Sequence, residues 1–268
     1  MIKMVALDLD NTLLNSQKQI SPRNTRDLRK LHQQGVKVVL CTGRPINAIW
    51  PYIEQLDLTK PDDYTITYNG GLVVNNQSKA VLSHLDFSLS DLQPLFKYFH
   101  DHVLPLDLLD FDRVYEITDQ PRSIYKTVVK NIEFVDRSFA NLPNHPYAKA
   151  VLATDPSVVS KVKNNLPASI KKTYHVVQSQ AMILEFLPRQ VNKAAGLKPL
   201  LAHFQMNFDN LMTFGDADND IEMIQAAGCG VVMANGLPEV KAVANAQTDS
   251  NDDDGVATYL EHYFETLL

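Results

Sequence analysis

The chain has 268 residues, of which 45% are hydrophobic and 21% are charged, and its formal net charge is -6. This length can bury the cores of two domains, and the composition is that of an ordinary globular protein. The negative charge argues against a nucleic-acid partner, which would need basic patches, and no apolar run approaches the roughly 20 residues of a membrane span.

The cysteines and the N-terminal residues give an expectation for the cellular compartment. Cys41 and Cys229 are too few for a disulfide framework or a zinc site, and each lies in an apolar run, so we expect buried free thiols. The first apolar run is interrupted by Asp8 and Asp10, a pattern that does not fit a signal peptide. We therefore expect a cytoplasmic protein, and the sequence leaves its oligomeric state open.

Strands and helices alternate through the first third of the chain. Short apolar runs that end in turn residues are typical of buried parallel strands, and proline at a helix start supports the helices between them. The alternation predicts a parallel sheet with right-handed crossovers. The expected elements are a strand beginning at Val5, a helix from Pro22 with Ser21 as its N-cap that Gly35 ends, a strand over 36–41, a helix beginning at Pro45, a strand over 64–68, and a hairpin of 72–74 with 80–82.

From about Asp86 the pattern changes. Paired strands with few helices predict a separate α+β unit with an antiparallel sheet, although residues 119–145 match no clear pattern. The expected elements are a helix over 90–102, strands over 104–110, 114–117 and 147–154, a helix over 156–166, and a hairpin of 172–178 with 181–187 that turns at Ser179 and Gln180.

After Pro188 the alternation of strands and helices resumes. The expected elements are a helix over 191–205, a strand over 211–215, a helix over 221–227, a strand over 230–233, a short helix over 238–244 and a closing helix over 256–268. We therefore predict an α/β protein with a Rossmann-like parallel-sheet core formed by residues 1–84 and 189–268. An inserted α+β domain of residues 85–188 interrupts this core.

Polar residues follow three of the predicted strands. They are Asp8 with Asp10, Thr42-Gly43-Arg44, and the acidic run from Asp216 to Asp220, while Lys193 lies near the start of the helix that re-enters the core. The carboxyl ends of parallel strands meet at one edge of a sheet, where such folds bind ligands. Converging carboxylates without nearby His or Cys favour Mg2+ over zinc or copper.

The same edge offers donors for an anion. The Thr42 hydroxyl, the Gly43 backbone and the Lys193 ammonium could bind a phosphate beside the metal, and a spare carboxylate remains. This combination predicts phosphate chemistry. Because no Gly-rich Walker loop is present, a nucleotide-triphosphate engine of that type is not supported.

The four motifs together resemble the haloacid dehalogenase (HAD) superfamily of phosphohydrolases. They are Asp-Leu-Asp-Asn-Thr-Leu-Leu, Thr-Gly-Arg, a lone Lys, and Gly-Asp-Ala-Asp-Asn-Asp. Their order and the place of the insertion resemble the Cof-type phosphatases of sugar phosphates and similar metabolites. The resemblance implies a HAD-like fold whose insertion is a cap that selects the substrate, a small phosphate ester.

The resemblance also implies a role for each matching residue. Asp8 would be the nucleophile, and Asp10 would be the general acid for the leaving alcohol and then the general base for water. The remaining roles are phosphate binding by Thr42, Gly43, Lys193 and Asn219, Mg2+ binding by the Asp8 carboxylate, the Asp10 backbone carbonyl and the Asp216 carboxylate, and support of these groups by Asp220, Arg44 and Asn69.

Three details of the match remain open. For Arg44, a phosphate contact and a structural ion pair are equally compatible with the sequence. Asn11 stands where the Cof-type pattern usually has Gly, although Asn tolerates positive φ better than most residues. Asp218 is expected to be a solvated loop residue, and Asn235 and residues 251–253 are expected in loops near the site.

The leading hypothesis is a Mg2+-dependent phosphatase for small phosphorylated metabolites. A phosphomutase or phosphotransferase would use the same aspartyl phosphate and differ only in the acceptor of the phosphoryl group. A non-catalytic phosphate-binding regulatory protein is the alternative from another class. This alternative is disfavoured because every catalytic position is filled. Receiver domains, which are regulatory proteins with a similar set of residues, do not need a second carboxylate such as Asp10 two residues after the phosphoacceptor.

Overall fold

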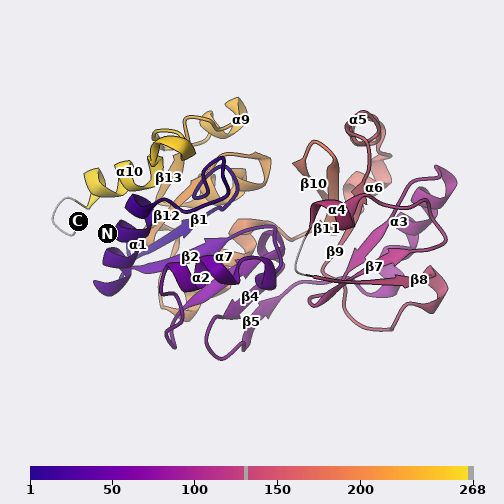
Figure 1. Cartoon of the computed structure of the whole chain (residues 1–268), viewed down its shortest axis with the longest axis horizontal. Coiled ribbons are helices and arrows are strands. Elements are labelled where there is room, and N and C mark those ends of the chain that lie inside the picture. Colours follow the sequence, from indigo (N-terminus) through magenta and orange to yellow (C-terminus); the bar gives the residue numbers. More distant parts are fainter. Residues whose placement is uncertain (130–131, 265–268) are drawn as a thin grey trace. The chain divides into compact units, whose positions relative to one another are not determined.

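The chain folds into two compact units. The computed structural model describes residues 1–129 and 132–264 (Figure 1). One unit comprises Met1–His84 and Asn192–Leu268, and the other comprises Leu85–Val191, whereas the sequence analysis placed the second boundary between residues 188 and 189. Among the described residues, none of the helices combines the length and apolarity that a membrane crossing requires.

An eight-stranded sheet forms the centre of the first unit. Its strands are β1 (Met4–Leu7), β2 (Lys37–Cys41), β3 (Tyr64–Thr67), β4 (Leu72–Asn75), β5 (Val81–His84), β12 (Leu211–Gly215), β13 (Cys229–Val232) and β14 (Ala246–Gln247). Their order is β14-β13-β12-β1-β2-β3-β4-β5. The strands from β14 to β3 run parallel, and β4 and β5 complete the sheet as an antiparallel hairpin. The predicted Rossmann-like sheet is confirmed, and β1 lies near its centre.

Helices cover both faces of this sheet. They are α1 (Pro22–Gln33), α2 (Trp50–Gln55), α7 (Lys193–His203), α8 (Ile221–Ala226), α9 (Pro238–Lys241) and α10 (Gly255–Tyr263), with single 3-10 turns η1 (Ile46–Ala48), η2 (Tyr68–Gly70), η4 (Phe208–Asn210), η5 (Asp218–Asp220) and η6 (Asn251–Asp253). Residues 265–268 of the predicted closing helix lie outside the described residues.

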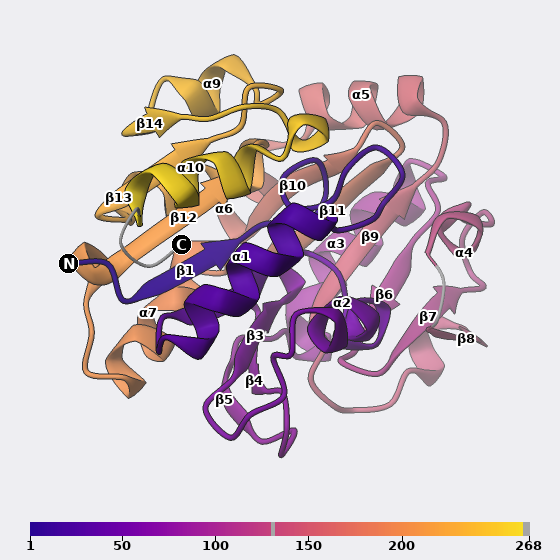
Figure 2. The same ribbon diagram turned by 60° about the vertical axis from the view of Figure 1, so that its left-hand side comes forward.

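Alternation along the strands explains the two buried faces. In β1, Val5 and Leu7 pack into one apolar cluster with residues of α1 and α10, and Met4 and Ala6 pack into another with residues of α7 and α8. Figure 2 shows α1 and α10 side by side on the first of these faces. Burial of both faces requires the continuous apolar runs that the sequence shows.

The start of α7 is held by close backbone packing. The Asn192 side chain accepts a hydrogen bond from the Ala195 N–H at 2.8 Å and so caps the helix in front of Lys193. Gly70 has φ +99°, and a Cβ on it would lie 2.0 Å from the Asn192 carbonyl oxygen. Only glycine allows η2 and α7 to approach this closely. The close approach fixes the first turn of α7 and therefore the position of Lys193.

The second unit contains a six-stranded sheet of order β10-β11-β9-β6-β7-β8. Its elements are α3 (Leu89–Asp101), β6 (Asp107–Leu109), β7 (Arg113–Ile117), α4 (Tyr125–Val128), β8 (Glu133–Arg137), η3 (Phe139–Asn141), β9 (Lys149–Ala153), α5 (Pro156–Asn165), α6 (Ala168–Thr173), β10 (Tyr174–Gln180) and β11 (Ile183–Pro188). One face packs against α3 and α5 through an aromatic-rich cluster. All pairs are antiparallel except β7 with β8.

Three predictions for this unit need correction. The strand predicted from residue 172 begins at Tyr174, because α6 occupies 168–173 with Lys171 and Lys172 in its last turn, where cations interact favourably with the helix dipole. The turn predicted at Ser179 and Gln180 lies at 181–182, because a register shift between Gln178 and Gln180 lengthens β10. The sheet, expected to be antiparallel, also contains one parallel pair, since β8 forms within the unassigned residues 119–145.

A buried carboxylate lies on this sheet. Asp107 is fully buried in β6 beside Glu116 of β7, and neither of its oxygens has a hydrogen-bond partner among the described residues. The nearby Ser123 hydroxyl donates instead to the Ala153 carbonyl at 3.3 Å. Burial raises the pKa of Asp107 to about 7, against a smaller opposing effect of Ser123.

Asp107→Asn is expected to change the pH dependence of stability. The folded-state pKa lies above the unfolded value, so the folded chain holds more protons between about pH 4 and pH 7, and wild-type stability falls as pH rises through this range. Asn cannot ionise, so the variant should gain about 1–3 kcal/mol over the wild type at pH 8 and much less at pH 5. Thermal unfolding at both pH values measures this, with exposed Asp112→Asn as control. A gain of equal size at both pH values would contradict the prediction.

Gly70→Ala and Gly35→Ala form a matched pair for the packing of α7. Both glycines have φ above +90°, but a Cβ on Gly35 meets nothing within 4 Å. Gly35→Ala should cost only the backbone strain of about 1–2 kcal/mol. Gly70→Ala should cost a further 1–3 kcal/mol or so, because it collides with the Asn192 carbonyl. Melting temperatures measured by calorimetry should therefore fall further for Gly70→Ala, and equal shifts would show that the close approach is easily relaxed.

Candidate active site

The carboxyl ends of three parallel strands meet at one edge of the first sheet. Leu7 at the end of β1 pairs with Leu40 of β2 on one side and with Phe214 of β12 on the other. This register places Asp8, which follows β1, level with Cys41 and Gly215, the last residues of β2 and β12, so that Thr42 and Asp216 follow directly beside it. The predicted meeting of the polar strand ends is therefore present.

A buried ammonium joins two of the carboxylates at this edge. Lys193 is fully buried, and its Nζ donates to Asp8 Oδ1 at 2.5 Å and to Asp220 Oδ1 at 2.6 Å. The other oxygen of Asp220 accepts the backbone N–H groups of Asp216 and Ala217 at 2.9 and 3.0 Å. Burial acts to lower the pKa of Lys193, but Asp220 and Asp8 outweigh it and hold the pKa above its ordinary value. Lys193 therefore stays charged.

Three buried carboxylates form a cluster that fits a metal ion. Asp8, Asp216 and Asp220 each offer an oxygen, and these oxygens lie within 4.8 Å of one another. Burial raises the pKa of Asp8 well above its ordinary value and that of Asp216 to about 7, and the neighbouring carboxylates add to both effects. A cation bound here would offset the repulsion between the carboxylates, and an all-oxygen donor set suits a hard divalent ion. The Thr12 hydroxyl donates to Asp216 Oδ1 at 2.8 Å and orients that carboxylate.

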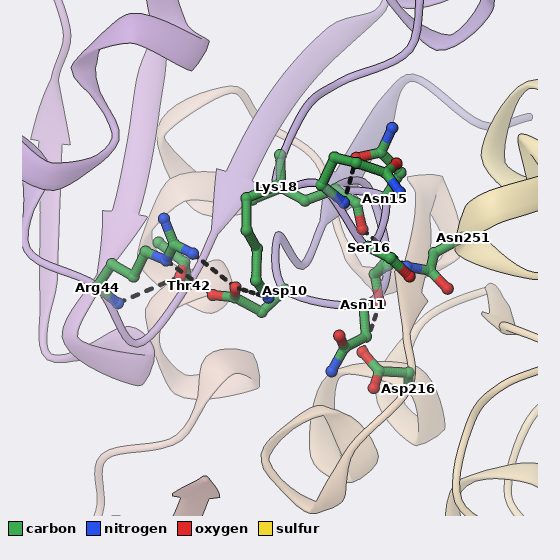
Figure 3. A network of polar contacts seen from close by, with 12 residues as sticks. Asp10, Asn11, Asn15, Ser16, Lys18, Thr42, Arg44, Asp216 and Asn251 are labelled. Carbon is green, nitrogen blue, oxygen red and sulfur yellow. Dashed lines mark hydrogen bonds and ion pairs between the residues drawn. The ribbon is translucent and has the colours of Figure 1, made fainter. Parts of the chain in front are cut away.

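Asp10 lies outside this cluster and has cationic partners of its own (Figure 3). Arg44 donates from Nε to Oδ2 at 2.7 Å and from Nη2 to Oδ1 at 2.6 Å, and Lys18 Nζ donates to Oδ1 at 2.9 Å. Burial acts to raise the pKa of Asp10, but Arg44 and Lys18 outweigh it and lower the pKa. Of the two possibilities left open for Arg44, the structure shows the ion pair.

Amide and hydroxyl groups connect the loops after β2, β3 and β12. The Thr42 hydroxyl accepts a hydrogen bond from the Arg44 N–H at 3.2 Å. The Thr42 backbone carbonyl accepts a hydrogen bond from the Asn69 N–H at 3.0 Å. Asn69 is almost fully buried, and its side chain accepts a hydrogen bond from Asn219 at 3.0 Å. A Cβ on Gly43 would lie 3.0 Å from the Asn69 side chain. Asn69 is therefore an internal bridge between these loops.

Two further asparagines hold the loop that follows Asp10. Asn235 donates to the Asn11 carbonyl at 2.8 Å, and Asn251 donates to the Leu14 carbonyl at 2.9 Å. The Asn251 N–H in turn donates to the Asn235 side chain at 3.0 Å. Asn11 has φ +61°, as expected for a residue that tolerates the left-handed region. These loops lie where the sequence analysis expected them, and Asp218 is exposed, also as expected.

Sequence reasoning missed Lys18 and the part played by Thr12. Lys18 belongs to no motif and approaches Asp10 only because the loop of residues 15–19 folds back. Thr12 belongs to the first motif, but the motif alone assigns it no role. In the structure its hydroxyl orients Asp216, which lies 204 positions later in the sequence.

Comparisons with known proteins agree with this geometry. The family of haloacid dehalogenase-like hydrolases matches residues 5–260. YxeH of Bacillus subtilis (strain 168) is 33% identical over 262 residues, which cover 96% of both chains. The 5-amino-6-(5-phospho-D-ribitylamino)uracil phosphatase YitU of the same organism is 29% identical over an alignment of 285 residues that covers 97% of each chain.

A solved structure gives the same assignment. A haloacid dehalogenase-like hydrolase from Bacteroides thetaiotaomicron superimposes with a TM-score of 0.85 at 30% identity, covering 98% of this chain and all of that one. The match runs through both halves of the core and the insertion, as the family match does. The chain therefore belongs to the haloacid dehalogenase-like hydrolases.

Proposed function

We propose that this protein is a Mg2+-dependent phosphatase that hydrolyses monoesters of small phosphorylated metabolites through an aspartyl phosphate on Asp8. The observation that carries the proposal is the contact of Lys193 with Asp8 inside a cluster of three buried carboxylates. This arrangement places the proposed nucleophile Asp8 beside one fixed cation, the Lys193 ammonium. It also places Asp8 beside carboxylate oxygens that could bind a second cation, the metal ion. The phosphatase name of the relative YitU supports the class of substrate.

In the first half of the reaction, Asp8 attacks the ester. One of its carboxylate oxygens forms a bond to phosphorus while the bond from phosphorus to the leaving oxygen breaks. Asp10, in its protonated form, donates its proton to that leaving oxygen, so an alcohol departs. Lys193, the Thr42 hydroxyl and the Gly43 and Asn219 N–H groups are proposed to bind the phosphoryl oxygens, because phosphoryl transfer depends chiefly on positioning and charge neutralisation.

In the second half, water releases the phosphate. Asp10, now ionised, takes a proton from a water whose oxygen attacks phosphorus, and the bond from phosphorus to Asp8 breaks. Inorganic phosphate leaves, and the proton taken from water serves the next leaving group. Arg44 suits this second half, since its two hydrogen bonds hold the Asp10 carboxylate in one orientation and favour the ionised form that takes the proton.

We propose that the Asp8 carboxylate, the Asp10 backbone carbonyl and the Asp216 carboxylate hold the Mg2+. When bound, the ion neutralises negative charge so that an anionic ester can approach an anionic nucleophile. Asp220 is part of the carboxylate cluster, but Lys193 and two backbone N–H groups already occupy its oxygens. We therefore assign it to positioning Lys193 and Asp216.

The reaction class is tested by phosphate release from a panel of esters. Sugar phosphates, nucleotides, pyridoxal phosphate and a chromogenic aryl phosphate are each assayed with Mg2+ and with EDTA. We expect Mg2+-dependent release, and Asp8→Asn should lower it by roughly three orders of magnitude or more. The exposed Asp218→Asn, from the acidic loop after β12, is the matched control and should keep wild-type activity.

Other outcomes of the same assay would contradict the proposal. Substantial activity in Asp8→Asn would remove Asp8 from the nucleophile role. Transfer of phosphate to a second hydroxyl compound without release would identify a phosphotransferase or mutase. Binding of esters without either reaction would identify a regulatory binding protein.

Metal binding separates the roles of Asp10 and Asp216. Asp216→Asn should weaken Mg2+ binding roughly tenfold or more, because a ligand carboxylate is lost, whereas Asp10→Asn keeps the backbone carbonyl and should change binding much less. Because the pKa of Asp216 is about 7 and only the ionised form binds metal, wild-type affinity should rise between pH 6 and pH 8. Calorimetric titration with MgCl2 measures both effects, and equal losses in the two variants would refute this ligand set.

A further inference from the structure

A surplus positive charge lies beside Asp10. Arg44 already balances the single charge of this carboxylate and gives one hydrogen bond to each oxygen. Lys18 adds a third hydrogen bond at 2.9 Å, so the group of three side chains carries one net positive charge. The Lys18 side chain is 52% exposed, so solvent and solutes can reach it.

The backbone holds Lys18 in this position at some cost. Lys18 has φ +59°, a left-handed conformation that is unfavourable for a side-chain-bearing residue. Its N–H donates to the Asn15 carbonyl at 2.8 Å, and its carbonyl accepts the Tyr52 hydroxyl at 3.0 Å. Ser16 is fastened to Asp252 by its N–H at 2.7 Å and its hydroxyl at 2.5 Å. The loop is therefore fixed on both sides, and Figure 3 shows Lys18 extending from it to Asp10.

The reach of this ammonium follows from the role of Asp10. A general acid lies about 3 Å from the oxygen that it protonates. Since Lys18 Nζ lies 2.9 Å from Asp10 Oδ1, it lies within about 6 Å of the leaving oxygen. An anionic group attached one or two carbons away from that oxygen can form an ion pair over this distance.

We propose that Lys18 binds a second anionic group on the leaving part of the substrate, so that the preferred substrates are small phosphate monoesters that also carry a carboxylate or a second phosphate near the ester. This inference rests on the proposed function, because it needs Asp10 at the leaving oxygen. When Lys18 pairs with the substrate, Asp10 Oδ1 loses one of its donors and becomes available to the leaving oxygen, while Arg44 keeps the carboxylate in place.

Charge-matched esters test the inference. Phosphoglycolate, ethyl phosphate and O-phosphoethanolamine have two-carbon leaving groups that carry a carboxylate, no charge and an ammonium. 3-Phosphoglycerate and glycerol 3-phosphate form a larger pair. We measure kcat/KM with saturating Mg2+ and expect the wild type to prefer the carboxylate ester over the neutral one roughly tenfold or more in each series.

Variants of Lys18 should change this preference. Lys18→Met should bring the ratio of anionic to neutral ester close to one, and Lys18→Glu should shift the preference to phosphoethanolamine. Lys37→Met is the matched control, because Lys37 pairs with Asp62 at the opposite end of β2 and should leave the ratio unchanged.

The outcomes separate three explanations. If Lys18→Met lowers kcat/KM for every ester by the same factor, Lys18 acts only by holding Asp10, and the inference is wrong. Hydrolysis of panel esters without a preference for a second anionic group would also overturn it, while the proposed function would stand. No Mg2+-dependent release from any ester of either set would overturn the proposed function itself.

Discussion

The site depends on the buried ammonium of Lys193. A single cation without access to solvent is stable only where carboxylates surround it, and Asp8 and Asp220 both lie within hydrogen-bond distance. One positive charge nevertheless cannot balance the three carboxylates of the cluster. The remaining negative charge makes this edge of the sheet a place that could hold a further cation. The close packing of Gly70 on α7 and the hydrogen bonds of Asp220 to the loop after β12 both serve to keep Lys193 in place.

Two carboxylates that are two residues apart experience opposite electrostatic environments. Burial and neighbouring carboxylates raise the pKa of Asp8, whereas Arg44 and Lys18 lower that of Asp10 in spite of its burial. The difference arises because β1 ends between them, so Asp8 points into the cluster and Asp10 turns toward the loop after β2. The difference in environment therefore comes from strand geometry and from basic residues on separate loops.

Much of the fold could be predicted from the sequence, and the reason is physical. Buried parallel strands need uninterrupted apolar runs, so β1, β2 and β12 can be recognised in the sequence as short apolar segments. The polar residues that follow these segments mark the edge of the sheet at which such folds bind ligands. Short elements such as β14 lack enough residues to show a period. Parallel pairing of β7 with β8 depends on contacts that no local pattern reports.

The same limit applies to the details of the site. The motif residues Asp8, Asp216 and Lys193 are recognisable because their type and order are specific. Lys18 became visible only once the folded loop brought it to Asp10, since an exposed lysine in a polar loop has no distinguishing pattern. The bridge between Asn69 and Asn219 likewise joins residues 150 positions apart.

The position of β1 has a consequence for biosynthesis. One neighbour of β1 is β2, but the other is β12, whose residues from Leu211 pair with residues from Met4. During translation the first strand therefore remains an unprotected apolar edge until most of the chain has emerged from the ribosome. The unit of Leu85–Val191, in contrast, draws its strands from one continuous segment that is made before β12. All residues of the second unit are thus synthesised before the first unit is complete, and Asp8 cannot meet Lys193 and Asp220 until synthesis is nearly finished.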